Sequence, residues 1–132
     1  MTHRIPLVLI AGSLMLTACA SSSQKMSRSD FEDIPVPAGL TYRQDESTVI
    51  ETPRIRAGRQ VYRGRLTIDS LSTAIRTTLE ANSWRHVSTQ TSKHGTTQVY
   101  EKEGDSLQVL LWEGTWYTYA EYTMGRVVKT AK

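Results

Sequence analysis

The sequence predicts an α+β domain in which one helix packs on a mostly antiparallel sheet of four to five strands. Apolar residues recur with the period of a helix over residues 69–82. From Trp84 onward, short alternating segments are separated by turns that contain glycine. A further alternating segment precedes the helix, so the expected order is strand, helix and then a meander of strands.

The first eighteen residues have the pattern of a secretory signal peptide. A short positively charged start, Met1–Arg4, is followed by the apolar run Ile5–Leu16 and then by small residues. A helix of those twelve residues would span roughly 18 Å, which is shorter than the ~30 Å hydrocarbon layer of a membrane. We therefore expect residues 1–18 to be removed after export.

The apolar run ends in Leu16-Thr17-Ala18-Cys19, which resembles the lipobox of bacterial lipoproteins. The resemblance implies that Cys19 carries a diacylglycerol on its sulfur, that the chain is cut before it and that the new amine is acylated. Three acyl chains would give stable membrane anchoring. Ala20 stands where Asp would resemble an inner-membrane retention signal, so the resemblance also implies the outer membrane, with the domain facing the periplasm.

Residues 19–33 are serine-rich and have no periodic apolar face, which predicts a lipidated flexible tether. The folded domain is expected over residues 34–128, with a frayed tail at 129–132. The tether leads into a proline-rich segment, residues 34–40, which we expect to lie extended against the domain edge. Tyr42 and residues 48–50 are predicted to add a short edge strand that ends at Pro53.

Residues 54–65 are rich in arginine, with a turn predicted at Gly58 and a strand over Gln60–Leu66. Side chains alternate between the faces of a strand. One face is expected to point inward and to hold Tyr62 together with Gly64, where the missing side chain would let another element approach the sheet. The opposite face then carries Arg59, Val61, Arg63 and Arg65.

The helix is predicted over Asp69–Asn82, with Asp69 as N-cap and Asn82 in the left-handed position that ends it. Its core-facing stripe consists of Leu71, Ala74, Ile75, Thr78 and Leu79. The strands after it are expected near residues 84–91, 97–103, 106–113 and 116–124, with a two-residue turn at Gly104-Asp105. One helix cannot cover five strands, so part of the sheet should face away from it.

Catalytic and metal-binding patterns are not visible in the sequence. His86 and His94 have no His-x-x-x-His or cysteine partner, and a metal site needs three or four converging ligands. Phosphate-binding glycine loops and nucleophile motifs are also missing. We therefore predict a protein that is not an enzyme and has no cofactor. The net charge of +3 is mild, and nucleic acid is an unexpected partner for an exported chain.

Two contact surfaces are predicted, each with a plainer alternative. The arginines could bind carboxylate or phosphate groups, or could form ordinary ion pairs with Glu101, Glu103 or Glu121. The aromatic residues could form a partner surface, or could line the core. The predicted partner-binding residues are Trp112, Trp116, Tyr117, Tyr119, Arg59, Arg63 and Arg65.

The leading hypothesis is a lipid-anchored envelope protein that binds or scaffolds an envelope protein, peptidoglycan or lipopolysaccharide. The alternative is a small-ligand or glycan-binding module that uses Arg56 or Arg59 for an anion, and a cell-wall hydrolase is a third reading. The segments Pro35-Val36-Pro37, Tyr62-Arg63-Gly64 and Asn82-Ser83-Trp84 are also similar to a group of small proteobacterial envelope lipoproteins. A glycine stands at the position of Ser83 in that group, and we carry over no functional residue.

Overall fold

A computed structural model describes residue 31 and residues 33–127 of the chain. The signal peptide, Cys19, most of the predicted tether and the predicted tail lie outside the described residues. The described elements are β1 (Thr41–Tyr42), η2 (Gln44–Glu46), β2 (Thr48–Glu51), β3 (Ile55–Gly64), α1 (Ile68–Ala81), β4 (Arg85–Ser92), β5 (Gly95–Lys102), β6 (Asp105–Glu113) and β7 (Thr118–Val127).

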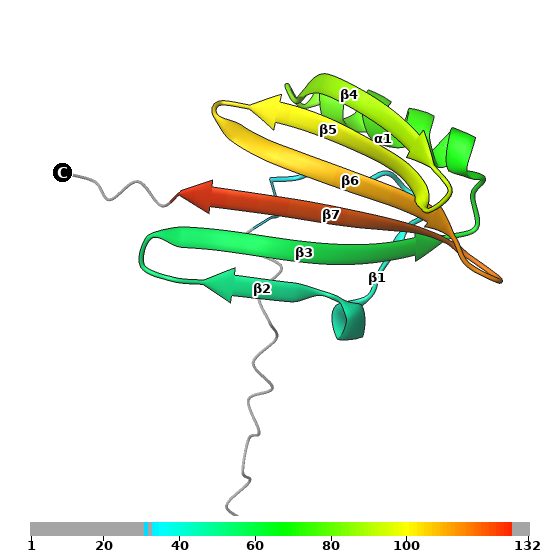
Figure 1. The fold of residues 1–132 in the computed structure, drawn as a ribbon, viewed down its shortest axis with the longest axis horizontal. Coiled ribbons are helices and arrows are strands. Elements are labelled where there is room, and N and C mark those ends of the chain that lie inside the picture. The colour runs from blue at the N-terminus through cyan, green and yellow to red at the C-terminus, as the bar shows by residue number, and fades with distance from the viewer. Residues whose placement is uncertain (1–30, 32, 128–132) are drawn as a thin grey trace, which may run out of the picture.

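The strands form one antiparallel sheet in the order β1-β3-β7-β6-β5-β4, and β2 also pairs with β3 (Figure 1). The predicted class is confirmed, since one helix packs on a mostly antiparallel sheet. The predicted count of four to five strands is too low, because the sheet has seven. The difference lies at the edge, where β1 and β2 are two short strands that pair with successive parts of β3 and are separated by η2.

Two elements cover the same face of the sheet, which we call the inner face. The helix α1 lies across β4–β6 and buries Leu71, Ile75 and Leu79 completely (Figure 1). The segment that begins at Phe31 covers β3 and β7, and Phe31 is only 2% exposed. Asp33 forms an ion pair with Arg126 of β7. The prediction that the tether extends to residue 33 is therefore wrong, because Phe31 and Asp33 already belong to the domain.

Two glycines of β3 make room for this segment. A Cβ atom on Gly64 would lie 2.7 Å from the carbonyl oxygen of Gly39, which confirms the predicted close approach of another element. Tyr62 points inward and is 2% exposed, also as predicted. The turn predicted at Gly58 is wrong, because Gly58 lies within β3. A Cβ atom there would lie 2.3 Å from the Phe31 ring.

The ends of α1 differ from the prediction by one or two residues. The N-cap is Thr67 rather than Asp69, and its hydroxyl accepts a hydrogen bond from the Ser70 N–H at 3.3 Å. Asn82 has a φ of −107°, and the left-handed residue is Ser83, with a φ of 68°. The Ser83 N–H bonds to the Glu80 carbonyl and the Trp84 N–H to the Leu79 carbonyl, which closes the helix as a Schellman motif.

The hairpin between β5 and β6 turns at Glu103-Gly104 rather than at Gly104-Asp105. Both turn residues have positive φ, 51° for Glu103 and 88° for Gly104, as a two-residue hairpin turn of type I′ requires. Asp105 already belongs to β6 and pairs with Lys102. Within the described part of the chain, no helix is long and apolar enough to cross a membrane.

Candidate aromatic and arginine surface

The outer face of the sheet, opposite α1, carries a row of large side chains near one end of the strands. Arg63 of β3 lies beside Tyr119 of β7, and Tyr119 lies beside Trp112 of β6. The Trp112 and Tyr119 rings are stacked, with centroids 5.2 Å apart and planes 8° from parallel. Both are half-buried, because each covers one face of the other.

Two arginines share one aromatic ring at this end of the sheet. The guanidinium carbon of Arg63 lies 4.5 Å from the centroid of the Tyr117 ring, and that of Arg65 lies 5.3 Å from it. A hydrogen bond from Arg65, together with the charges of Arg65, Arg63 and Arg43, lowers the pKa of the Tyr117 hydroxyl. Among the described residues, neither Arg63 nor Arg65 has a carboxylate partner.

Trp116 extends this surface beyond the ends of the strands. It lies in the connection between β6 and β7, which is closed by a hydrogen bond of 2.8 Å from the Gly114 N–H to the Tyr117 carbonyl. A Cβ atom on Gly114 would lie 2.7 Å from the Tyr119 ring, so the connection needs glycine there. The Trp116 side chain is 81% exposed. The loop thus holds a large aromatic ring in solvent.

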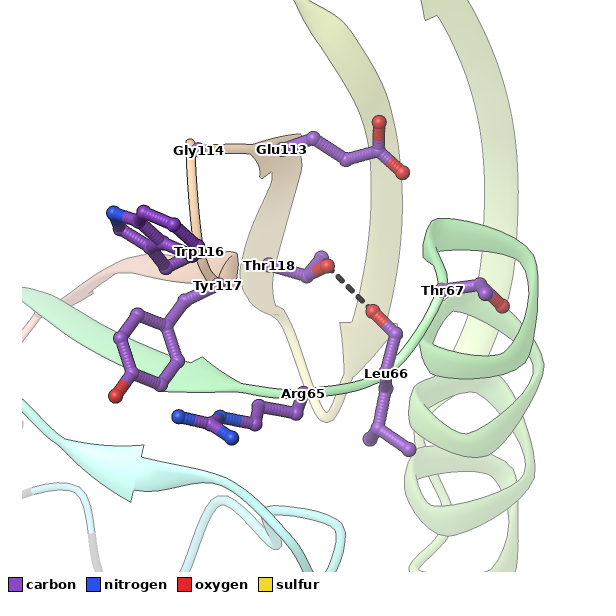
Figure 2. A pocket seen from close by; sticks show the side chains of 8 residues that line it. All are labelled: Arg65, Leu66, Thr67, Glu113, Gly114, Trp116, Tyr117 and Thr118. Atoms are coloured by element: carbon purple, nitrogen blue, oxygen red, sulfur yellow. Dashed lines mark hydrogen bonds between the residues drawn. The ribbon is translucent and has the colours of Figure 1, made fainter.

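An open hollow of about 570 Å³ adjoins Trp116 (Figure 2). Its floor is tied together by a hydrogen bond from the Thr118 hydroxyl to the Leu66 carbonyl, which joins β7 to the segment before α1. Figure 2 shows Trp116, Tyr117 and Arg65 on one side of the hollow and the Glu113 carboxylate pointing toward α1 on the other. The hollow therefore offers an aromatic surface, a cation and an acceptor.

Arg59 does not join this group. It forms an ion pair of 2.7 Å with Glu121 and donates a hydrogen bond of 2.9 Å to the Glu46 carbonyl. The hydrogen bond to Glu121 raises the pKa of Arg59. Arg56, the other arginine considered for an anion, pairs with Glu51 at 2.7 Å. Arg59 therefore fits the plainer alternative, an ordinary surface ion pair. The other six predicted partner-binding residues do lie together: Trp112, Trp116, Tyr117, Tyr119, Arg63 and Arg65.

Sequence reasoning missed Arg43, whose guanidinium lies near enough to Tyr117 to contribute to the lowering of its pKa. Its backbone N–H donates to the Val61 carbonyl at 2.8 Å, and its side chain pairs with Asp45 and Glu46. These ion pairs hold the Arg43 side chain, so its charge is already neutralised locally. Arg43 follows a strand of only two residues, too short for a periodic signal that would have placed it.

The histidine and metal predictions concern other parts of the fold. His86 lies 2.8 Å from the Thr89 hydroxyl and packs against the Tyr100 ring. Among residues 31 and 33–127, no three His, Cys, Asp or Glu side chains come together as a metal site would require. No protein-family model, no curated protein and no solved structure matches this chain.

Proposed function

We propose that this chain is a lipid-anchored, non-enzymatic protein of the outer membrane that binds an envelope partner through its outer face. The binding surface consists of Arg63, Arg65, Trp112, Trp116, Tyr117 and Tyr119, and we call it the aromatic–arginine surface. The observation that carries the proposal is the pair Arg63 and Arg65, which are held on Tyr117 without a carboxylate partner in the described part of the chain.

The residue types of this surface favour a role in binding a partner over a role in stabilising the fold. Tryptophan, tyrosine and arginine are the residues enriched at interface hot spots, where they bury large areas on association. The stacked rings of Trp112 and Tyr119 and the shared ring of Tyr117 restrict these side chains before any partner arrives. A preorganised surface loses less conformational entropy on binding. The inner face, in contrast, is already covered by α1 and residues 33–40.

The predicted lipid anchor indicates in which compartment that partner would be found. The lipobox resemblance at Leu16–Cys19 implies a lipid on Cys19, which would keep the domain at the membrane. Because export and lipidation would place the domain in the envelope, the partner would be an envelope protein or a component of peptidoglycan or lipopolysaccharide. The proposal includes no catalytic step and no cofactor.

The test combines fractionation with cross-linking in cells. The Cys19→Ser variant should leave the membrane fraction, because it lacks the sulfur that takes up lipid. A photo-reactive amino acid at position 116 should cross-link a partner, whereas the same amino acid at Thr73, exposed on α1, should not. A Cys19→Ser chain that still sediments with membranes at the normal mature mass would contradict the anchor. Equal cross-linking from both positions would contradict the surface.

A further inference from the structure

We infer that the hollow beside Trp116 binds an acidic sugar, with the indole stacked on the sugar ring and Arg63 and Arg65 bound to its carboxylate or phosphate. This inference rests on the proposed function, because it names the ligand class of the same surface. It depends on three features: a free aromatic face, a pair of cations and an acceptor on the opposite side. Arg65 lines the hollow, and Arg63 lies on the Tyr117 ring that also lines it. Neither arginine has a carboxylate partner in the part of the chain that the structure describes.

Trp116 supplies the free aromatic face. The chain has three tryptophans, and the other two are already packed: Trp84 is 1% exposed, and Trp112 is stacked on Tyr119. Trp116 is 81% exposed, although the hydrogen bond between Gly114 and Tyr117 fixes its loop. The C–H groups on one face of a pyranose ring pack well against such a ring. A sugar would therefore remove an exposed apolar surface from water.

Arg63 and Arg65 supply the cations. They lie two residues apart along the chain, and both guanidinium groups rest on the Tyr117 ring within 5.3 Å of its centroid. A planar guanidinium binds a carboxylate or phosphate through two parallel hydrogen bonds. The Tyr117 ring therefore holds two positive charges close to the hollow, which would attract an anion there. Arg43 and Arg59 nearby are engaged with Asp45, Glu46 and Glu121 and would not compete.

Glu113 makes a sugar a better ligand than a bare polyanion. Its carboxylate lies on the α1 side of the hollow, across from Arg65 (Figure 2). A carboxylate accepts hydrogen bonds from sugar hydroxyls but repels a second negative charge. The volume of about 570 Å³ lies within the range of small-molecule sites. The hollow therefore suits a sugar with one acidic group near Arg65 and hydroxyls near Glu113.

The experiment follows the indole N–H signals of the whole chain in detergent by NMR while sugars are added. The probes are the disaccharide of N-acetylglucosamine and N-acetylmuramic acid, which has a carboxylate, N-acetylglucosamine 6-phosphate, and neutral chitobiose. We expect at least one acidic sugar to shift the Trp116 signal saturably and chitobiose to bind at least tenfold more weakly. The Trp84 signal should stay in place, because that side chain is buried. The acidic sugar that binds identifies the anion as carboxylate or phosphate.

Variants separate the two halves of the site. Arg63→Gln combined with Arg65→Gln should weaken acidic sugar binding at least tenfold, and Trp116→Ala should abolish the binding heat in calorimetry. Arg59→Gln and Arg85→Gln, whose arginines pair with Glu121 and Glu101, are matched controls and should change affinity less than twofold. An unchanged Trp84 signal shows that each variant is folded.

Several outcomes would overturn the inference. These are no saturable shift with either acidic sugar, equal affinity for chitobiose, or undiminished binding by the double arginine variant. Tighter binding of a glutamate-rich peptide than of either acidic sugar would replace the sugar with an acidic protein segment. If no acidic sugar binds but position 116 cross-links a protein in cells, this inference falls and the proposed function stands. If a sugar binds but Cys19→Ser remains in the membrane, the anchor falls and the site stands.

Discussion

The two faces of the sheet use the same strands for different purposes. On β6, Leu111 points to the inner face and is fully buried, whereas the next residue, Trp112, lies half-buried on the outer face. On β7, Tyr122 is buried on the inner face, whereas Tyr119 lies on the outer face with its ring on Trp112. The inner face is closed by α1 and the segment from Phe31, and neither element reaches the outer face.

The two faces also differ in how their polar groups are satisfied. Inside, Gln98 is only 2% exposed, donates a hydrogen bond to the Ser72 hydroxyl at 2.8 Å and accepts one from the Tyr100 hydroxyl at 2.9 Å. Outside, Arg63 and Arg65 rest on an aromatic ring and keep their charge. Buried polar groups with partners specify one arrangement of the core. Charges without carboxylate partners contribute little to stability and remain available for a ligand.

The largest expected difference between the faces is in packing energy, and two neighbouring leucines measure it. Leu111→Ala should lower the free energy of unfolding by about 2–5 kcal/mol, because Leu111 is fully buried and its loss leaves a cavity. Leu110→Ala, on the outer face, should cost about 1 kcal/mol or less, because Leu110 is half-buried. Urea unfolding of both variants checks the comparison. Equal losses would mean that the outer face is a second core.

A smaller effect is expected where the chain backbone approaches the inner face. Gly64→Ala should destabilise the domain by about 1–3 kcal/mol, because the new Cβ atom would press on the Gly39 carbonyl. Gly125→Ala on β7 is the matched control, since nothing lies within 4 Å of its Cβ position. It should be neutral or slightly stabilising, because alanine loses less backbone entropy than glycine in a strand. Destabilisation of the same size in both variants would contradict the close approach as the cause.

Local periodicity explains which parts of the fold were predictable. The apolar stripe of α1 and the alternation of β3 are both local patterns, so the helix and the inward side of Tyr62 were predicted correctly. Gly58 was predicted as a turn, because a glycine in an arginine-rich segment gives the same local signal as a turn. Its actual role is to admit the Phe31 ring, and that contact joins residues that no local pattern connects.

The candidate site was predictable in composition but not in arrangement. The aromatic residues cluster near the end of the sequence, so they stood out together. Which arginines form ion pairs and which do not depends on Glu121. Glu121 reaches Arg59 only because β3 pairs directly with β7, although α1 and three strands lie between them in the sequence. The sequence named Glu121 as one of three possible partners, yet only the strand register selects it. The same register leaves Arg63 beside Tyr119 instead of beside an acid.

The smallest expected difference between the faces is in tyrosine ionisation. Burial raises the pKa of Tyr100 on the inner face to about 12, and burial also raises the pKa of Tyr122. The hydrogen bond from Arg65 lowers the pKa of Tyr117 on the outer face. An absorbance titration at about 295 nm should therefore show Tyr117 ionising first and the inner tyrosines last. The Tyr117→Phe variant should remove the earliest step, and Arg65→Gln should move that step to higher pH.

The raised pKa of Tyr100 also has a consequence for stability. An unfolded tyrosine ionises near pH 10, so the folded state binds the proton more tightly than the unfolded state. This contribution is fully present below about pH 10 and is lost as the pH rises through about 12. The urea midpoint should therefore fall above pH 10. It should also fall in the Tyr117→Phe variant, because the lowered pKa of Tyr117 adds stability as the pH rises, so losing this tyrosine cannot remove the fall. A fall that disappears in Tyr117→Phe would place the pH-sensitive tyrosine on the outer face instead.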